Sequence, residues 1–569
     1  MRFSYLAAAL LAAGLVASTA PRTIAQTPGP GRPAASGPSR LVVVLVADQF
    51  RADYVTQYSE MWTAGLKEIL TKGAAFSEAA YPYANTRTCP GHASIGTGML
   101  PAVHGMVDNT WYDRATHEFI ACTEDHQARS LPFGGQHGEE THGARWYLVP
   151  NFADELKRQL NGRPRVVSLS LKARSAIGLG GHGGVNSTIV WKEDGATTFA
   201  TSSALTKTAS PAVDAFVRSH PVLLKQFETW ERAKPEASYK YTDQAPGEPA
   251  ARGTFPHLFN EPVRLSDTTV SILDSWDGTP MADEYLGAMA EHLVAQEQLG
   301  QRQTTDFLAV SFSTLDIVGH DYGPRSHEVQ DVLLRLDATI GRLLAVLDAK
   351  VGRDRYVLAF SSDHGVSTLP EQVFPAPAAG SGRGPGGGGV TGRITAANIA
   401  NAAEAALDKQ FGRGHYVEAL ATPYLYFVPG VLERIRANPS AVQAVEAAVL
   451  GVRGIAKLYW TPDIAATTAT TDPTLIGLRR SYYPGRTGDL AFVYERNWTG
   501  PTGANHGSPQ DYDARVPLMF LGAGIAPGQH AGTASPVDIV PTLSALTGVR
   551  MPRTDGRVLR EALANAGTR

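Results

Sequence analysis

The sequence predicts an α/β fold in which helices cover an open, mostly parallel sheet. Two observations carry this prediction. Short apolar runs rich in β-branched residues alternate along the chain with stretches of helical periodicity, an order typical of α/β sheets. The runs are also largely apolar on both faces, as strands buried on both sides of a parallel sheet are.

The first three strands are expected at Leu41–Ala47, Arg165–Leu171 and Asp306–Ser313. Each is a short run with an apolar, largely β-branched centre, which favours a buried strand. The stretch Val329–Lys350 follows, with apolar residues three or four positions apart on one stripe, and predicts a long helix packed on the sheet. Arg355–Ser361 supplies the next strand.

The last strand is expected at Pro517–Leu521. Two irregular segments rich in Gly, Pro, Trp and Tyr, at about 185–280 and 370–500, interrupt the pattern and are interpreted as insertions that cap a site. The low-complexity stretch Pro375–Gly392 is interpreted as a flexible surface loop. A phosphate-binding glycine loop is the weaker alternative, because no Lys-Ser/Thr follows it.

Composition excludes several classes of protein. The 569 residues are 43% hydrophobic and 18% charged, with 51 basic and 54 acidic residues, so the chain is neither disordered, collagen-like nor a multispan membrane protein. The near-neutral balance provides no polybasic surface for nucleic acid. We therefore expect small, locally recognised substrates.

The N-terminus has the pattern of a secretory signal peptide. Met1-Arg2 precedes an apolar run from Tyr5 to Ala17 and a small-residue cleavage site, and this run is too short to span a membrane. We expect a signal peptide at 1–25, a flexible Pro/Gly/Ser-rich leader at 26–40 and a single catalytic domain at 41–569. The mature protein is then periplasmic or secreted, without a membrane anchor. An uncleaved anchor or a core helix is the alternative.

The chain has two cysteines, Cys89 and Cys122. An exported protein can form a disulfide from such a pair. The sequence does not say whether their Cα atoms lie within bonding range, so a disulfide and two free buried thiols both stay open.

Three acidic residues follow the ends of predicted strands. Asp48 closes the first strand, Asp316 follows the strand that ends at Ser313, and Asp363 follows the strand that ends at Ser361. Ligands of open α/β sheets bind at this edge, so we expect the three carboxylates to meet in one crevice. A single Asp in such a place is more often a helix cap or turn residue.

Histidines accompany these carboxylates. His320 lies four residues after Asp316, on the same face of a helical turn, His364 follows Asp363 directly, and His506 precedes the last strand. Mixed Asp/His sets suit zinc, and two such sets predict a two-metal site.

Thr88 is the candidate nucleophile. The segment Thr88-Cys89-Pro90-Gly91 places its hydroxyl at the start of a helix, where backbone N–H groups can face a phosphate oxygen. An N-cap role is the plainer interpretation of this threonine. Thr86 offers a second hydroxyl, and Cys89 is a rival nucleophile without an identifiable relay.

Seven motifs occur in order along the chain. They are Asp48-Gln49-Phe50-Arg51, Thr88-Cys89-Pro90-Gly91-His92-Ala93-Ser94-Ile95, Pro101-x-x-His104-Gly105 with Asn109, Ser170-Leu171-Lys172-Ala173-Arg174, Asp316-x-x-x-His320-x-x-Gly323-Pro324, Ser362-Asp363-His364-Gly365 and His506-Gly507. Together they resemble the phosphate-irrepressible (PafA-type) alkaline phosphatases of the alkaline phosphatase superfamily, close to the nucleotide pyrophosphatase/phosphodiesterase branch. The resemblance runs from about residue 41 to the end. Formylglycine sulfatases require Cys-x-Pro-x-Arg, which this chain lacks.

The resemblance implies an alkaline-phosphatase-like three-layer α/β/α sandwich and two zinc ions per chain, with additional magnesium or calcium left open. It assigns one zinc to Asp316, His320 and His506, and the other to Asp48, Asp363, His364 and the Thr88 oxygen. It also implies attack by Thr88 on phosphorus, a phosphothreonine intermediate, and hydrolysis of that intermediate by water.

The same resemblance assigns Asn109, Lys172 and Arg174 to the substrate phosphate. A cationic pair and an amide donor complement the charge of a phosphate monoester, so a monoesterase acting on small phosphorylated substrates is expected. Lys172 and Arg174 are expected to project from one face at the end of an extended run. A phosphodiesterase or nucleotide pyrophosphatase and a binding protein without turnover are the alternatives. The oligomeric state is left undecided.

Overall fold

The computed structural model describes residues 39–135, 138–194, 196–222, 229–250, 252–258, 263–265, 268–270, 276–373 and 392–564. The chain divides into Met1–Ser36 and a compact unit, Gly37–Arg569, which is the part described below. The expected signal peptide, all but the end of the expected leader, and nearly all of the Gly-rich stretch lie outside the described residues.

A ten-stranded mixed sheet forms the centre of this unit, as expected. Its middle strands are parallel: β1 (Leu41–Ala47) lies between β11 (Asp306–Phe312) and β12 (Tyr356–Ser361), and β11 pairs with β6 (Val166–Ser170). The strand order is β20 (Gly528–Ala534), β2 (Ala74–Ala79), β19 (Leu518–Gly522), β12, β1, β11, β6, β7 (Ser187–Lys192), β8 (Phe199–Ser202) and β5 (Ser130–Pro132).

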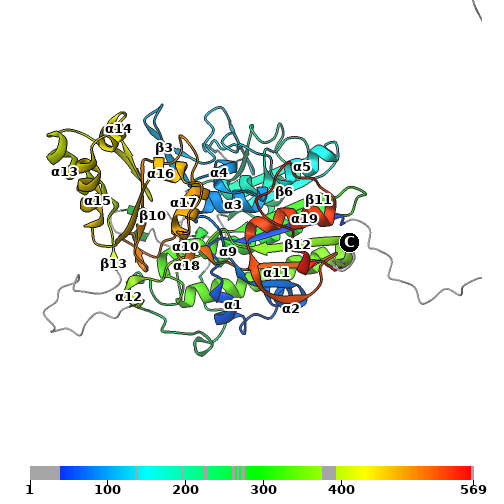
Figure 1. Ribbon diagram of the computed structural model, residues 1–569. Helices are drawn as coiled ribbons and strands as arrows, with labels where there is room; N and C mark the ends of the chain where they lie inside the picture. Colours follow the sequence, from blue (N-terminus) through cyan, green and yellow to red (C-terminus); the bar gives the residue numbers. More distant parts are fainter. Residues whose placement is uncertain are drawn as a thin grey trace, which may run out of the picture. The chain divides into compact units, whose positions relative to one another are not determined.

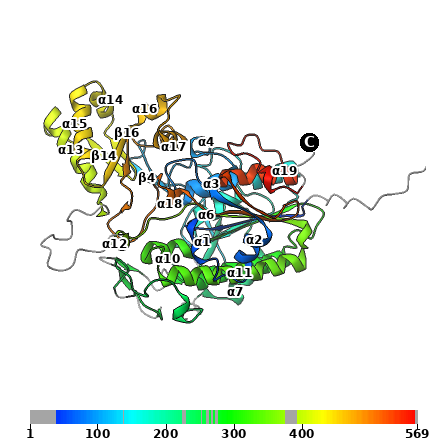
Figure 2. The same ribbon diagram turned by 60° about the horizontal axis from the view of Figure 1, so that its bottom comes forward.

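Side chains of β1 alternate between two hydrophobic cores, because successive residues of a strand point to opposite faces. Leu41, Val43 and Leu45 belong to one core, and Val42 and Val44 belong to the other. Helices cover both faces, so the fold has the three layers that the sequence predicts. Figures 1 and 2 show α3 and α19 on one side of the sheet and α11 on the other.

Each helix can be assigned to one layer by the core to which its apolar residues belong. The first core takes apolar residues from α1 (Asp53–Tyr58), α2 (Gly65–Lys72), α7 (Pro211–Ser219), α9 (Pro280–Gln296), α10 (Thr314–Tyr322) and α11 (His327–Lys350). The second takes them from α3 (Thr88–Thr97), α5 (Phe152–Gln159), α6 (Ala173–Gly180) and α19 (Ile539–Thr547). The expected helix Val329–Lys350 is confirmed as α11, which begins two residues earlier.

Two features of the sheet differ from the expectation. The strand predicted at Pro517–Leu521 is β19, and it is antiparallel to both β12 and β2. Its buried apolar run resembles that of a parallel strand because helices cover it on both faces. In addition, β7 and β8 lie within the segment 185–280, so the start of that segment extends the central sheet instead of forming an insertion.

Residues 392–499 build a smaller lobe with its own core. A four-stranded antiparallel sheet, β14 (Val417–Ala421), β15 (Tyr424–Phe427), β17 (Leu490–Tyr494) and β16 (Ile455–Trp460), packs against α13 (Ala396–Phe411) and α15 (Pro439–Leu450). The lobe also contains α14 (Val431–Arg436), α16 (Thr461–Ala466), α17 (Pro473–Ser481) and the short pair β13 (Gly392–Arg393) and β18 (Trp498–Thr499). It corresponds to most of the second predicted insertion.

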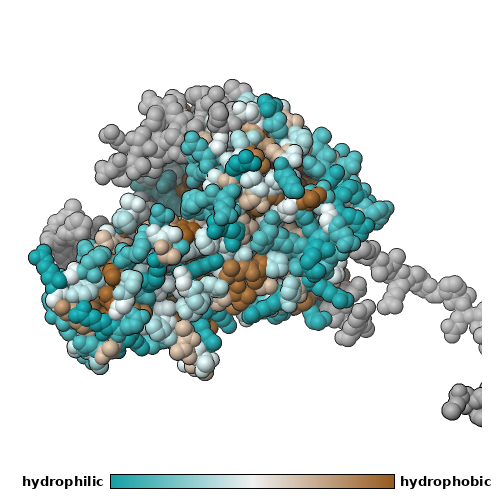
Figure 3. Space-filling view, turned by 90° about the horizontal axis from the view of Figure 1, so that it is seen from above, coloured by the Kyte–Doolittle hydropathy of each residue, from teal (hydrophilic) through white to brown (hydrophobic). Residues whose placement is uncertain are grey.

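The remaining elements are short: α4 (Pro101–His104), the hairpin β3 (Thr110–Asp113) and β4 (Glu118–Ala121), the pair β9 (Val263–Leu265) and β10 (Thr268–Val270), α12 (Pro370–Val373) and α18 (Asp511–Ala514). None of the described helices has the length and apolar character needed to cross a membrane. The face in Figure 3 is mostly hydrophilic, with hydrophobic residues confined to limited areas.

Candidate active site

The three predicted carboxylates meet at the carboxyl edge of the parallel strands. Asp48 follows β1, Asp316 lies in the first turn of α10 just after β11, and Asp363 follows β12. All three are buried. Because β11 and β12 flank β1, the chain brings three acidic side chains into one crevice, as the sequence predicts.

Lys172 lies between two of these carboxylates. Its Nζ is 2.7 Å from Asp48 Oδ2 and 2.5 Å from Asp316 Oδ2. Burial raises the pKa of Asp48, and the neighbouring charges of Asp316 and Asp363 raise it further. For Asp316, burial acts in the same direction, but Lys172, His320 and His506 together outweigh it and hold the pKa well below its ordinary value. The raised pKa of Asp48 shows that its negative charge is unfavourable in this crevice, which favours the binding of a cation there.

His364 presents one ring nitrogen to the crevice. Its Nδ1 lies 2.9 Å from the main-chain oxygen of Gly365 and so carries the proton, because a carbonyl only accepts. Its Nε2 lies 3.3 Å from Asp363 Oδ2 and 3.5 Å from Asp48 Oδ1. Burial lowers the pKa of His364. Nε2 is therefore a neutral acceptor directed at two carboxylates.

His320 and His506 repeat this arrangement. Nδ1 of His320 donates to the Ala504 carbonyl at 2.6 Å, and Nδ1 of His506 donates to the Thr86 carbonyl at 2.9 Å. The two Nε2 atoms lie 3.2 Å and 3.8 Å, respectively, from Asp316 Oδ1. A main-chain carbonyl that fixes the tautomer on one side of the ring is the usual support of a metal-ligating histidine.

These residues fit a pair of zinc ions. Asp48, Asp363 and His364 place ligand atoms within 4.8 Å of one another, and so do Asp316, His364 and His506. Asp48 Oδ1 and Asp363 Oδ2 are buried and accept no hydrogen bond from the residues that the structure describes. Unsatisfied buried carboxylate oxygens are costly unless a cation is bound. Oxygen and imidazole donors together match the preferences of zinc.

The two groups agree with the ligand sets implied by the resemblance except at one position. The set Asp48, Asp363 and His364 is reproduced. In the other set, His364 takes the place expected for His320, although His320 Nε2 lies closer to Asp316 than His506 Nε2 does. His364 therefore lies between the two groups.

Thr88 is the first helical residue of α3 and is buried at 1% exposure. Its Oγ1 lies 3.3 Å from His364 Nε2, which places the hydroxyl beside the first ligand group. The helix contacts the strand end closely at Gly91, where a Cβ atom would lie 2.4 Å from the main-chain oxygen of Asp363. Only glycine allows this approach.

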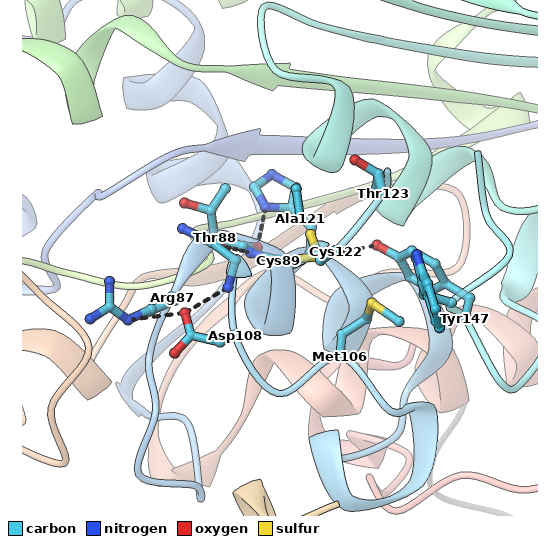
Figure 4. Close-up of a disulfide and its surroundings, with 12 residues drawn as sticks. Arg87, Thr88, Cys89, Met106, Asp108, Ala121, Cys122, Thr123 and Tyr147 are labelled. Atoms are coloured by element: carbon cyan, nitrogen blue, oxygen red, sulfur yellow. Dashed lines mark hydrogen bonds and ion pairs between the residues drawn. A yellow bond between two sulfur atoms is a disulfide. The ribbon is translucent and has the colours of Figure 1, made fainter. Parts of the chain in front are cut away.

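The two rival nucleophiles, Cys89 and Thr86, already have bonding partners. Cys89 and Cys122 form a disulfide, which Figure 4 shows. Their Cα atoms lie 6.7 Å apart. The Thr86 hydroxyl donates to the main-chain oxygen of Ser508 at 2.8 Å. Thr88 is thus the hydroxyl of this segment that remains available to a substrate.

Lys172 lies in the crevice, Asn109 is hydrogen-bonded to the residue that follows Thr88, and Arg174 comes two residues after Lys172. Lys172 is the N-cap of α6, and Arg174 lies in the first turn of that helix. The buried Nε of Arg174 has no hydrogen-bond partner among the described residues. Asn109 Oδ1 accepts from the Cys89 N–H at 2.8 Å, which orients the amide group toward α3. Lys172 ends an extended run as expected, but the expectation was wrong for Arg174, because α6 begins at Ala173.

The sequence did not predict that Gln49 and His92 hold the carboxylates of the site in position. The main-chain N–H of Gln49 donates to Asp363 Oδ1 at 3.1 Å, its Nε2 donates to Asp316 Oδ1 at 2.5 Å, and its φ is +66°. His92 Nδ1 lies 3.2 Å from Asp363 Oδ2, and its Nε2 is 2.7 Å from Ser311 Oγ. Gln49 directly follows a predicted metal ligand, and His92 lies four residues after Thr88 on the same helix. These spacings could have indicated their roles.

Comparison with known proteins identifies a family and several relatives. Residues 42–378 match the family described as type I phosphodiesterase / nucleotide pyrophosphatase. Alkaline phosphatase PhoV of Synechococcus elongatus is 28% identical over 92% of this chain and 93% of its own. Alkaline phosphatase PafA of Elizabethkingia meningoseptica is 27% identical over 90% and 92%, respectively. A crystal structure of wild-type alkaline phosphatase PafA superposes with a TM-score of 0.80 at 26% identity, covering 93% of this chain and all of the other.

Proposed function

The chain belongs to the type I phosphodiesterase / nucleotide pyrophosphatase family, and we propose that it is an alkaline phosphatase that hydrolyses phosphate monoesters through a phosphothreonine on Thr88. One observation carries the proposal. A helix-terminal hydroxyl lies 3.3 Å from His364 Nε2, within a crevice of three buried carboxylates. Relatives that match the chain over nine-tenths of its length are named alkaline phosphatases.

Two zinc ions are part of the proposal. Asp48, Asp363 and His364 hold one, and Asp316, with His506 and His320, holds the other. Bound zinc supplies two effects: it lowers the pKa of a coordinated hydroxyl, and it offsets charge on the oxygens that enter and leave phosphorus.

In the first step, Thr88 Oγ attacks phosphorus in line with the leaving oxygen. The bond between Oγ and phosphorus forms, the ester P–O bond breaks, and the alcohol leaves after taking up a proton. The first turn of α3 offers few free donors, because the Cys89 N–H donates to Asn109 Oδ1, the Gly91 N–H donates to the Arg87 carbonyl and Pro90 has no N–H. Side chains therefore stabilise the charge of the phosphoryl oxygens.

In the second step, water attacks the phosphothreonine from the side that the alcohol vacated. The Oγ–phosphorus bond breaks, inorganic phosphate leaves, and Thr88 recovers its hydroxyl. Throughout, Asn109 Nδ2, Lys172 and Arg174 contact the nonbridging oxygens. A monoester carries about two negative charges on these oxygens, so the two cations favour it over a diester.

We also propose that a signal peptide at residues 1–25 directs export of the protein. The charged start, short apolar run and small-residue site support it. The mature enzyme then acts in the periplasm or outside the cell.

A phosphodiesterase or nucleotide pyrophosphatase is the second candidate, favoured by the description of the matching family. Hydrolysis of p-nitrophenyl phosphate and bis-p-nitrophenyl phosphate by the zinc-loaded protein without residues 1–25, at alkaline pH, separates the two. We expect a strong preference for the monoester and no turnover of it by Thr88→Ala. A preference for the diester would move the protein to the second candidate.

A further inference from the structure

The Cys89–Cys122 disulfide lies next to the proposed nucleophile but takes no part in the proposed chemistry. Cys89 follows Thr88 directly in α3, and Cys122 follows the last residue of β4. Both cysteines are buried, and the bond joins positions 33 residues apart. Figure 4 shows it beside Thr88. The hydrogen bonds made by these two residues indicate what the bond holds in place.

Each cysteine binds one carbonyl oxygen of Asn109. The Cys89 N–H donates to Asn109 Oδ1 at 2.8 Å, and the Cys122 N–H donates to the main-chain oxygen of Asn109 at 2.9 Å. The disulfide closes this set of contacts into a ring of three residues. With Oδ1 occupied, Nδ2 is the side-chain donor of Asn109 that remains, and it has no hydrogen-bond partner among the described residues.

The disulfide thereby fastens the base of a hairpin to α3. Thr110 pairs with Ala121 at the start of the β3–β4 hairpin, so Asn109 and Cys122 form the next position along the ladder. Asn109 itself is only partly buried, whereas both cysteines are fully buried. Packing alone does not fix a partly exposed amide, which can rotate about its side-chain torsions.

A second contact fastens the same two segments on the other side of Thr88. Arg87 Nε lies 3.3 Å from Asp108 Oδ1, and this oxygen also accepts from the Asn109 N–H at 2.7 Å. Residues 87–89 are therefore joined to residues 108–109 by an ion pair and by the disulfide ring. This arrangement fixes the distance between the Thr88 hydroxyl and the Asn109 amide.

We infer that the Cys89–Cys122 disulfide positions Asn109, so that Nδ2 faces a nonbridging oxygen of phosphate bound at Thr88 and favours monoesters over diesters. This inference rests on the proposed function. The two cysteines are positioning residues, since they do not touch the substrate. A donor held in place in advance costs no reorganisation during the reaction, and a displacement of about 1 Å lowers a rate strongly.

The test is a double-mutant cycle between the disulfide and Asn109. The disulfide is removed by Cys89→Ala with Cys122→Ala, alone and together with Asn109→Ala, in zinc-loaded protein. We expect kcat/KM for p-nitrophenyl phosphate to fall roughly tenfold, and kcat/KM for bis-p-nitrophenyl phosphate to change less than about twofold. In the Asn109→Ala background, removal of the disulfide should change monoester hydrolysis less than about twofold.

The control is Ile189→Val, which removes one methylene from the hydrophobic cluster that contains both cysteines. It should destabilise the protein without changing the ratio of monoester to diester hydrolysis. Equal losses for both esters on disulfide removal, or the same loss with and without Asn109, would overturn the inference.

If the alanine variants do not fold, a phosphine reductant in zinc-containing buffer replaces them. The chain has two cysteines, so thiol titration of the unfolded protein should rise from zero to two per chain as monoester activity falls. Two titratable thiols before reduction would overturn the inference. A zinc-loaded wild type that does not hydrolyse the monoester would overturn the proposed function and this inference together.

Discussion

The imidazole rings of His364 and His506 stack with their centroids 3.5 Å apart and their planes 13° apart. His364 belongs to both candidate ligand groups, whereas His506 belongs to one. Burial lowers the pKa of both rings, and the proximity of His364 lowers that of His506 further. Both rings are therefore neutral, as metal ligation requires.

The zinc content of histidine variants should reflect that His364 belongs to both ligand groups and His506 to only one. His506→Ala should reduce zinc to about one ion per chain, and His364→Ala should reduce it further, because His364 contributes to both groups. Elemental analysis after dialysis measures the occupancy. His182→Ala is the control, since that histidine pairs with Asp154 at the surface and should leave zinc unchanged. Two zinc ions retained by His506→Ala would contradict the assignment.

Thr88→Ala should abolish steady turnover while zinc stays bound. The loss of the attacking hydroxyl should lower kcat by at least ~10³-fold, as is typical for a nucleophile. Initial rates on p-nitrophenyl phosphate and zinc analysis of the same sample check both halves of the prediction. Substantial remaining activity would mean that another group attacks phosphorus.

Arg174→Ala should lower the hydrolysis of the monoester much more than the hydrolysis of the diester. The guanidinium is assigned to the nonbridging oxygens, so its removal should lower kcat/KM for the monoester by roughly 10²-fold and for the diester only a few-fold. The matched control is Arg158→Ala, since Arg158 is an exposed arginine paired with Glu155 on α5. Equal losses on both esters after Arg174→Ala would remove the proposed role.

Glu328 should make stability depend on pH. It is fully buried, and its Oε1 lies 2.9 Å from His257 Nε2. Burial raises the pKa of Glu328 from 4.5 to about 8, and burial lowers the pKa of His257 to about 4. At Glu328 the native state keeps a proton that the unfolded state releases, so the contribution of this group to stability is complete below pH 4.5 and is lost as the pH rises to about 8. The lowered pKa of His257 acts in the opposite direction, and only below its ordinary value of 6.5.

Glu328→Gln should flatten this dependence, because the amide N–H can replace the protonated carboxyl as donor to His257. Urea unfolding between pH 5 and 8 should give a wild-type free energy of unfolding that falls by up to ~1.4 kcal/mol per pH unit relative to the variant. Glu236→Gln, at an exposed position, should not alter the slope. Parallel pH profiles for wild type and Glu328→Gln would contradict the prediction.

The sequence predicted the parallel core of the fold closely because its signals are local. Leu41–Ala47 is confirmed residue for residue as β1, and the long amphipathic stretch is confirmed as α11. The direction of β19 could not be predicted in this way, since apolar content reports burial on both faces and not the direction of the neighbouring strands.

The candidate site was predicted where its residues follow strand ends or share a helical turn, as Asp48 and the Asp316–His320 pair do. The disulfide could not be decided, because the 6.7 Å between its Cα atoms depends on the whole fold. The support by Gln49 was missed for a related reason: its positive φ directs both its main-chain and side-chain donors to carboxylates from other segments.

The close contact at Gly91 limits which residues can occupy that position. A Cβ there would lie 2.4 Å from the Asp363 carbonyl oxygen and 2.6 Å from the Asp363 Cβ, so main chain rests directly on main chain, and the spacing between hydroxyl and metal ligand does not depend on side-chain rotamers. Gly96 of the same helix rests in a similar way on the main-chain oxygen of Gly178. At Gly91, even alanine would separate the helix from the strand end, so this glycine should tolerate substitution as poorly as the nucleophile itself.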